Sequence, residues 1–232
     1  MIGLLILIAC GLGFAWYGSG ILVRLASDRR LRRRTRSQGV LALTFDDGPG
    51  AATTPELLDL LEARKGKATF FLIGEYATRN PEIVERIAAD GHTICWHSRT
   101  HRNQWKTDPI RGIVDLWNPP PILLQEPTIA HDFRPPYGKI TLGTLLVCWL
   151  RKWRIITWTH PSGDTDHRIP DADEFVDSID RAGGGVVLMH DMDRDDPERA
   201  RFVLRVTTGL LDLVERRQWK LISSPQEWKS LT

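Results

Sequence analysis

Thr44-Phe45-Asp46-Asp47-Gly48-Pro49 is the stretch that decides the fold, because it joins an apolar segment to two adjacent acids and a turn. Residues 40–45 predict a short buried strand, and Gly48-Pro49 turns the chain directly after it. Both carboxylates would then lie at the carboxyl end of a strand, where sites in α/β folds are usually built. Two adjacent negative charges in such a place favour a bound cation.

Two histidines, His97 and His101, lie four residues apart in the segment His97-Ser98-Arg99-Thr100-His101. This spacing predicts both imidazoles on one face of a helical turn, within reach of one ion. With Asp47 they form a two-histidine, one-aspartate set typical of a catalytic rather than a structural zinc site. Each pattern alone is more often a solvated turn or a surface pair. Their order after successive apolar segments favours a site.

Five segments together resemble the NodB-homology family of polysaccharide deacetylases, carbohydrate esterase family 4. In chain order they are residues 44–49, 97–101, 133–138, 158–165 and 187–191. The fourth is a loose match, because Thr165 follows Asp164 where many members carry tryptophan. The resemblance covers about residues 38–225, and it implies a distorted (β/α) barrel with the site at the carboxyl ends of its strands.

The resemblance also implies catalytic roles. Asp46 would be the general base, kept ionised by a bidentate pairing with a buried Arg134. His190 would be the general acid that protonates the departing amine, with Asp164 orienting its imidazole.

The same resemblance implies a metal site and a substrate pocket. The metal ligands would be Asp47, His97 and His101, and the ion a divalent metal: zinc, with cobalt, nickel or manganese as alternatives. The substrate-binding residues would be Tyr137, whose backbone N–H would hold the oxyanion, Pro136 and Leu188. Trp105 is a candidate platform for sugar stacking. Polar surface roles are expected for the other histidines, His92, His131, His160 and His167.

The first 23 residues contain no charged residue and are long enough to cross a bilayer as a helix, which predicts an uncleaved transmembrane anchor at 1–23. A cleaved signal peptide is the alternative, but its usual positive charge is missing before an apolar stretch that is too long. A buried helix of the domain is disfavoured by the seven arginines between Arg24 and Arg36. Residues 24–38 are expected to be a basic juxtamembrane linker, and 39–225 the catalytic domain.

The arginine-rich linker suits anionic lipid headgroups better than nucleic acid, so membrane lipid is an expected partner and nucleic acid is not. The arginines also favour a catalytic domain on the cytoplasmic side of a single-pass membrane protein. The family resemblance implies an extracytoplasmic domain instead, and that placement is expected. Three cysteines, Cys10, Cys95 and Cys148, do not require an oxidising compartment.

The chain has 232 residues, 42% of them hydrophobic, and a net charge of +2, which suits one ordinary domain plus an appendage. From Val40 onward, apolar strands alternate with helices, which predicts an α/β fold with parallel strands. Further strands are expected at 68–73, 93–96, 155–159, 186–190 and 219–222. Helices are expected at 54–66, 80–91, 110–117, 142–150, 173–182 and 197–217. The prolines at 119–121 predict a break, followed by a short strand or extended segment at 122–124.

These patterns predict a metal-dependent hydrolase that removes acetyl groups from N-acetylated sugars in a glycan such as peptidoglycan, a chitin-like polymer or exopolysaccharide. An O-acetyl esterase and a deformylase of a lipid-linked sugar are the enzymatic alternatives. A catalytically silent, membrane-tethered sugar-binding protein is the alternative of another class. Sugar binding alone would not require the complete set of acids, histidines and arginine, so the hydrolase is favoured.

Overall fold

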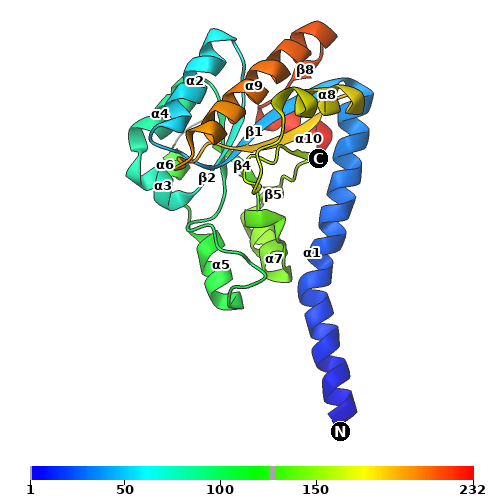
Figure 1. Ribbon diagram of the computed structural model, residues 1–232. Helices are drawn as coiled ribbons and strands as arrows, with labels where there is room; N and C mark the ends of the chain where they lie inside the picture. The colour runs from blue at the N-terminus through cyan, green and yellow to red at the C-terminus, as the bar shows by residue number, and fades with distance from the viewer. Residues whose placement is uncertain (1, 126–128) are drawn as a thin grey trace.

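The computed structural model describes residues 2–125 and 129–232, and its centre is a curled sheet of eight parallel strands (Figure 1). The strand order is β5-β4-β3-β2-β1-β7-β6, with β8 paired to the start of β1. The strands are β1 (Val40–Gly48), β2 (Thr69–Leu72), β3 (Thr93–Trp96), β4 (Ile129–Phe133), β5 (Arg154–Ile155), β6 (His160–Pro161), β7 (Gly185–His190) and β8 (Lys220–Leu221). The expected α/β fold with parallel strands is therefore confirmed.

Helices connect the strands and pack against both sides of the sheet. They are α1 (Ile2–Gln38), α2 (Thr53–Ala63), α3 (Gly74–Arg79), α4 (Pro81–Ala89), α5 (Pro109–Trp117), α6 (Ile122–Gln125), the 3-10 turn η1 (Pro136–Gly138), α7 (Leu142–Arg151), α8 (Ala172–Ala182), α9 (Pro197–Arg217) and α10 (Pro225–Leu231). Figure 1 shows α2, α4, α8 and α9 on one side of the sheet and α5 and α7 below it.

Alternation along β1 separates two apolar layers, because successive strand residues point to opposite faces. Leu41, Leu43 and Phe45 belong to the larger core under α2, α4, α8 and α9. Val40 and Ala42 belong to a smaller core inside the curl, which Trp228 of α10 helps to fill. Thr44 and Asp46 are the next inward-facing residues of β1. Their polar side chains therefore lie inside the curl near the carboxyl end of the strand.

Two expected elements differ in the structure. Residues 122–124 lie in helix α6 rather than in a strand, because Leu123 is buried in the main core as part of a helical turn. The strand expected at 155–159 does not form: β5 ends at Ile155, residues 156–159 are in no strand, and β6 begins at His160. Strands β5 and β6 occupy opposite edges of the sheet. The sheet is thus curled and has two edges, which leaves the segment between β5 and β6 without a neighbouring strand among the described residues.

Helix α1 covers this open segment. Arg24 donates to the Trp158 carbonyl oxygen at 3.2 Å, and its guanidinium lies 4.1 Å from the centre of the Trp158 ring. The hydroxyls of Ser27 and Thr157 are 2.7 Å apart. Leu31 is buried in the smaller core. The segment expected as a basic linker is therefore helical, and its inner side packs on the domain.

No helix among the residues that the structure describes is both long enough and apolar enough to cross a membrane. The transmembrane anchor expected at residues 1–23 consequently has no support in the structure.

Candidate active site

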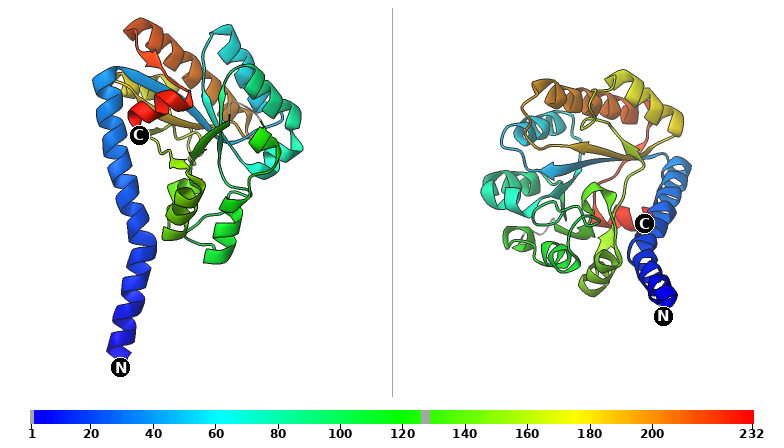
Figure 2. Two further views of the ribbon diagram at one scale, coloured as in Figure 1. Left: turned by 180° about the vertical axis from the view of Figure 1, so that it is seen from behind. Right: turned by 60° about the horizontal axis from the view of Figure 1, so that its bottom comes forward.

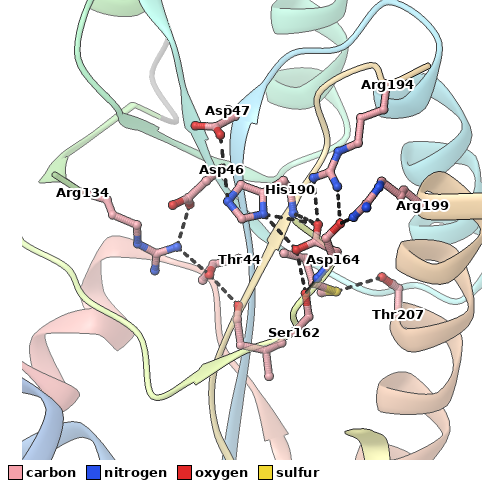
Figure 3. A network of polar contacts seen from close by, with 12 residues as sticks. Thr44, Asp46, Asp47, Arg134, Ser162, Asp164, His190, Arg194, Arg199 and Thr207 are labelled. Carbon is pink, nitrogen blue, oxygen red and sulfur yellow. Dashed lines mark hydrogen bonds and ion pairs between the residues drawn. The ribbon is translucent and has the colours of Figure 1, made fainter. Parts of the chain in front are cut away.

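The expected site residues come together at the carboxyl ends of four strands, as Figure 3 shows for several of them. Asp46 and Asp47 end β1, His97 follows β3, Arg134 follows β4 and His190 ends β7. Parallel strands align these ends at one edge, which is why residues from distant parts of the chain meet there.

The three expected metal ligands form a compact cluster. Their ligand atoms all lie within 4.8 Å of one another. Oδ1 of Asp47 is 3.2 Å from Nε2 of His97 and 3.0 Å from Nε2 of His101. This oxygen is buried, and no hydrogen-bond donor among the described residues pairs with it.

The tautomer of His97 explains why this cluster suits a cation. Nδ1 of His97 is 2.7 Å from the Arg134 carbonyl oxygen, which only accepts, so Nδ1 carries the proton. Nε2 then presents a lone pair toward the Asp47 carboxylate. Burial would raise the pKa of Asp47, but hydrogen bonds and positive charge from His101 and His97, when these are protonated, hold it well below its ordinary value. When the imidazoles are neutral, a bound cation would supply that charge instead. The residues present therefore fit a divalent metal held by one oxygen and two nitrogens.

The two histidines are not on a helical turn as expected, because residues 97–101 form an irregular loop. Ser98 and His101 have left-handed backbones, with φ of 68° and 57°. Such values cost about 1 kcal/mol or more for non-glycine residues. The loop is held by Asp115 of α5, whose Oδ1 accepts from the backbone N–H and the hydroxyl of Thr100 at 2.9 and 2.6 Å.

Left-handed residues elsewhere in the site strengthen this observation. Asp47 and Tyr137 have φ of 67° and 56°. Among the described residues, the remaining non-glycine positions with positive φ are Lys65, Lys152 and Gln218, which directly follow or close helices. Backbone strain outside helix ends is thus confined to the site, where it fixes the direction of ligands.

Arg134 is fully buried, as expected, and its Nη1 donates to Oδ1 of Asp46 at 2.7 Å. The pairing uses this one nitrogen, so the expected bidentate contact is wrong. The same Nη1 also donates to the Thr44 hydroxyl at 2.7 Å, and the guanidinium lies 3.9 Å from the centre of the Phe71 ring. The hydrogen bonds to Asp46 and Thr44 and the contact with the Phe71 ring hold Arg134 in place. Arg134 does not bond Oδ2 of Asp46, so this oxygen can accept a proton.

His190 is held from behind by Asp164, whose Oδ1 lies 3.0 Å from Nδ1. The carboxylate also accepts from the backbone N–H of His190 at 2.9 Å and from the Ser162 hydroxyl at 2.9 Å. Arg194 adds a third anchor at 3.1 Å. Burial lowers the pKa of His190, but the hydrogen bond and charge of Asp164 outweigh burial and raise it above its ordinary value.

The three expected substrate-binding residues lie in different surroundings. Leu188 and His190 line a cavity of about 460 Å³ that also reaches Asp164 and Phe175. Pro136 is buried, whereas the Tyr137 side chain is exposed and its ring centre is 4.6 Å from that of His101. The cavity therefore lies beside His190, the proposed general acid, and the Tyr137 ring forms an aromatic rim beside the metal ligand His101.

Two acids of the site region were not predicted. Asp191 is buried beneath the turn after β1 and accepts from the Thr54 hydroxyl at 2.6 Å; burial raises its pKa to about 7. A side chain at Gly48 would collide with its carboxylate. Asp193 accepts from the backbone N–H groups of residues 51–53 and so caps α2. Both contacts join residues about 140 positions apart, which local patterns do not reveal.

Two minor expectations also change. Trp105 is not an open sugar platform, because Lys139 lies 4.3 Å from its ring centre and Tyr17 of α1 packs against its edge. His92 is buried beside Phe70 rather than on the surface, and burial lowers its pKa to about 4.

Comparisons with known proteins identify the family of this chain. The polysaccharide deacetylase family profile matches residues 33–148. A peptidoglycan-N-acetylglucosamine deacetylase from Bacillus cereus is 38% identical over 154 residues, which are 65% of this chain and 55% of that protein. The match therefore spans about half the length of that relative. A chitooligosaccharide deacetylase from Sinorhizobium fredii is 31% identical, with 64% of this chain and 70% of that protein covered.

A solved structure shows the same fold. The peptidoglycan deacetylase PdaC from Bacillus subtilis superposes with a TM-score of 0.68 at 26% identity, covering 83% of this chain and 91% of that one. Profile, relatives and fold agree, and the chain belongs to the polysaccharide deacetylase family of hydrolases.

Proposed function

We propose that the protein is a divalent-metal-dependent deacetylase that hydrolyses the N-acetyl group of N-acetylglucosamine units in a glycan. The observation that carries this proposal is that a cluster suited to a metal and a histidine suited to donate a proton lie on opposite sides of one site. On one side, Asp47 and two imidazoles converge on a point that suits a cation, beside the carboxylate of Asp46. On the other side, the buried carboxylate of Asp164 raises the pKa of His190.

Each side chain has a defined part in amide hydrolysis. Zinc, the first choice of metal, would supply Lewis acidity to the attacking water and to the acetyl carbonyl. Asp46 would take the proton of that water through Oδ2, because Arg134 holds Oδ1. His190 would give its proton from Nε2 to the departing sugar nitrogen, while Asp164 holds Nδ1. The backbone N–H of Tyr137 would stabilise the oxyanion.

The names of the relatives support N-acetylglucosamine polymers as substrates. The B. cereus relative is named for peptidoglycan and the S. fredii relative for chitooligosaccharides. Release of O-acetyl or formyl groups would use the same devices, so the substrate assay must include them.

The test uses the full chain with N-acetylglucosamine oligomers, peptidoglycan, acetylated xylan and a formylated aminosugar. We expect acetate from the first two substrates, loss of activity with a chelator and recovery with added zinc. His190→Ala is the control and should slow turnover by roughly two to four decades. Zinc-loaded, folded protein that releases neither acetate nor formate from any of these substrates would contradict the proposal and favour a silent binding protein.

An extracytoplasmic placement is proposed on the substrate class alone, since peptidoglycan and chitin-like polymers lie outside the cell. The arginines of α1 argue for the opposite side. A C-terminal reporter that is active on one side only, combined with protease treatment of intact cells, distinguishes the two placements.

A further inference from the structure

Two neighbouring helices below the sheet present apolar side chains that nothing in the described structure covers. On α7 these are Leu142, Leu146, Trp149 and Leu150, at positions that share one helix face, and Trp149 is 75% exposed. On α5, Ile110 and Val114 are one turn apart, and Ile110 is 72% exposed. Monomeric soluble proteins rarely expose contiguous apolar patches larger than a few hundred Å².

Helix α1 joins these two helices at Gly143. A Cβ at this position would lie 3.0 Å from Trp16 of α1 and 3.3 Å from Ile113 of α5, so three helices meet there. The part of α1 before Arg24 has no charged residue, and it exposes Phe14 and Leu22. Figures 1 and 2 show this part projecting past α5 and α7, away from the sheet. We call the exposed apolar side chains of α5 and α7, together with Leu7, Phe14, Ile21 and Leu22 of α1, the lower face.

Basic residues border the lower face. Between residues 102 and 152, the exposed charged residues that the structure describes are Arg102, Lys106, Arg111 and Lys152, against one acid, Asp108. Arginines 29, 30, 32 and 33 follow the apolar part of α1 and are exposed. Arg30 also donates to the Thr232 carbonyl oxygen and Arg32 pairs with Asp28, so Arg29 and Arg33 are the two without an ion pair or hydrogen bond to the described residues. An apolar surface with a cationic border matches the interface of a bilayer that contains anionic lipids.

We propose that the lower face seats the protein on the surface of an anionic lipid bilayer. A second copy of the chain fits less well, because a two-fold contact would bring two basic borders together. A glycan also fits less well, because leucine and isoleucine side chains offer no partners for sugar hydroxyls. The lipid interface satisfies both the apolar centre and the basic border.

This seating would place the candidate active site beside the bilayer. Tyr17 of α1 packs on Trp105, four residues after His101. Gly20 of α1 lies against the backbone of Ile140, three residues after Tyr137. The loops that carry a metal ligand and the aromatic rim thus rest on the helix that leads into the lower face.

The test measures co-sedimentation of the full chain with vesicles of phosphatidylcholine, with and without 30 mol% phosphatidylglycerol as an example anionic fraction (about one lipid in three). Leu146→Glu/Trp149→Glu removes two exposed apolar side chains of α7. Arg205→Glu is the matched control, because it changes the net charge by the same amount on α9, across the sheet. Circular dichroism and hydrolysis of a soluble oligomer verify that both variants fold.

We expect the unmodified chain to bind anionic vesicles, with weaker binding at high salt. The double variant should bind roughly 100-fold more weakly, since each of the two lost apolar contacts is worth about a decade in partitioning. The control should bind like the unmodified chain. Equal binding by the double variant would overturn the proposal, and so would binding to neither vesicle. Self-association without lipid that the double variant abolishes would assign the face to a second copy instead.

Discussion

At the scale of single residues, the site is marked by a buried carboxylate oxygen that has no hydrogen-bond donor among the described residues. Oδ1 of Asp47 is buried against two imidazole nitrogens, and at least one of these nitrogens presents a lone pair. An uncompensated buried carboxylate is costly, so a cation is the natural complement. Asp46, the neighbouring residue, has its charge compensated by Arg134 instead. Two adjacent acids therefore have separate partners and separate roles.

The first prediction separates these two acids by metal content. Asp47→Ala and His101→Ala should bind zinc at least about 100-fold more weakly, because a three-ligand site loses one arm. Asp46→Asn should retain zinc and lose turnover. Elemental analysis after dialysis measures the difference. Retention by Asp47→Ala together with loss by Asp46→Asn would reverse the assignment.

The second prediction concerns the pH dependence set by Asp164. Burial lowers the pKa of His190, and the hydrogen bond and charge of Asp164 more than offset this, so the imidazole stays protonated to higher pH than a free one. Activity that needs this proton falls as pH rises through the raised pKa. In Asp164→Asn the pKa drops, so the basic limb of the kcat/KM profile should move to lower pH.

Circular dichroism of Asp164→Asn verifies that the fold persists, and Asp166→Asn, an exposed acid nearby, is the control. A basic limb that stays in place in Asp164→Asn would mean that His190 is not the acid that this limb reports.

The sequence and the resemblance placed the site residues well because strand-end positions follow from the order of strands. Asp46, His97, Arg134 and His190 meet for that reason. The contact between Arg134 and Asp46 through one nitrogen was not predictable, because Thr44 competes for the same donor. Asp191 and Asp193 were missed because their partners lie far away in the sequence.

At the scale of elements, strand and helix patterns were reliable wherever one face of the element is buried. Helix α9 and strand β7 agree with their predicted ranges closely. The second half of α1 was not predicted as part of the domain, because Leu31 and Thr35 are its fully buried residues among many arginines. Its targets at Thr157 and Trp158 are about 130 residues away. Charged residues dominate the local sequence of this helix. Its packing on the domain depends on residues that are distant in the sequence, so the local pattern does not reveal it.

The third prediction tests this packing. Leu31→Ala removes a buried side chain from the smaller core, so the free energy of unfolding should fall by about 2–4 kcal/mol. Arg33→Ala, an exposed position two residues later, should change it by less than about 0.5 kcal/mol. Urea denaturation of the two variants measures both values. Equal stabilities would mean that α1 is not packed on the domain in solution.

At the scale of the whole molecule, α1 and α10 together close the inner side of the curled sheet. Leu31 from one helix and Trp228 from the other share the smaller core with Val40 and Ile222. The second half of α1 and the C-terminal helix α10 are therefore packed against the same strand region. A protein that lacks either helix would expose this core to water.

The fourth prediction follows from that closure. A fragment that starts at Gly39 should melt at a temperature lower by several degrees or more than the full chain, because apolar surface of the smaller core becomes exposed. It should also bind a dye specific for exposed apolar surface more strongly. Differential scanning calorimetry measures the melting temperature, and a fragment starting at Leu22 is the control. Equal melting temperatures of both fragments would contradict this assignment.

The contacts of Trp158 with Arg24 and Arg134 have a consequence for chimeric proteins. Both guanidinium groups lie over the Trp158 ring, Arg24 at 4.1 Å and Arg134 at 5.7 Å from its centre. Arg134 also donates to Asp46, the proposed base, so α1 and the catalytic centre both contact the Trp158 side chain. A graft that joins this hydrolase to a foreign N-terminal segment should therefore place its junction before Arg24. A junction at Gly39 would remove Arg24, and with it one of the contacts that hold Trp158 against Arg134, the partner of the proposed base.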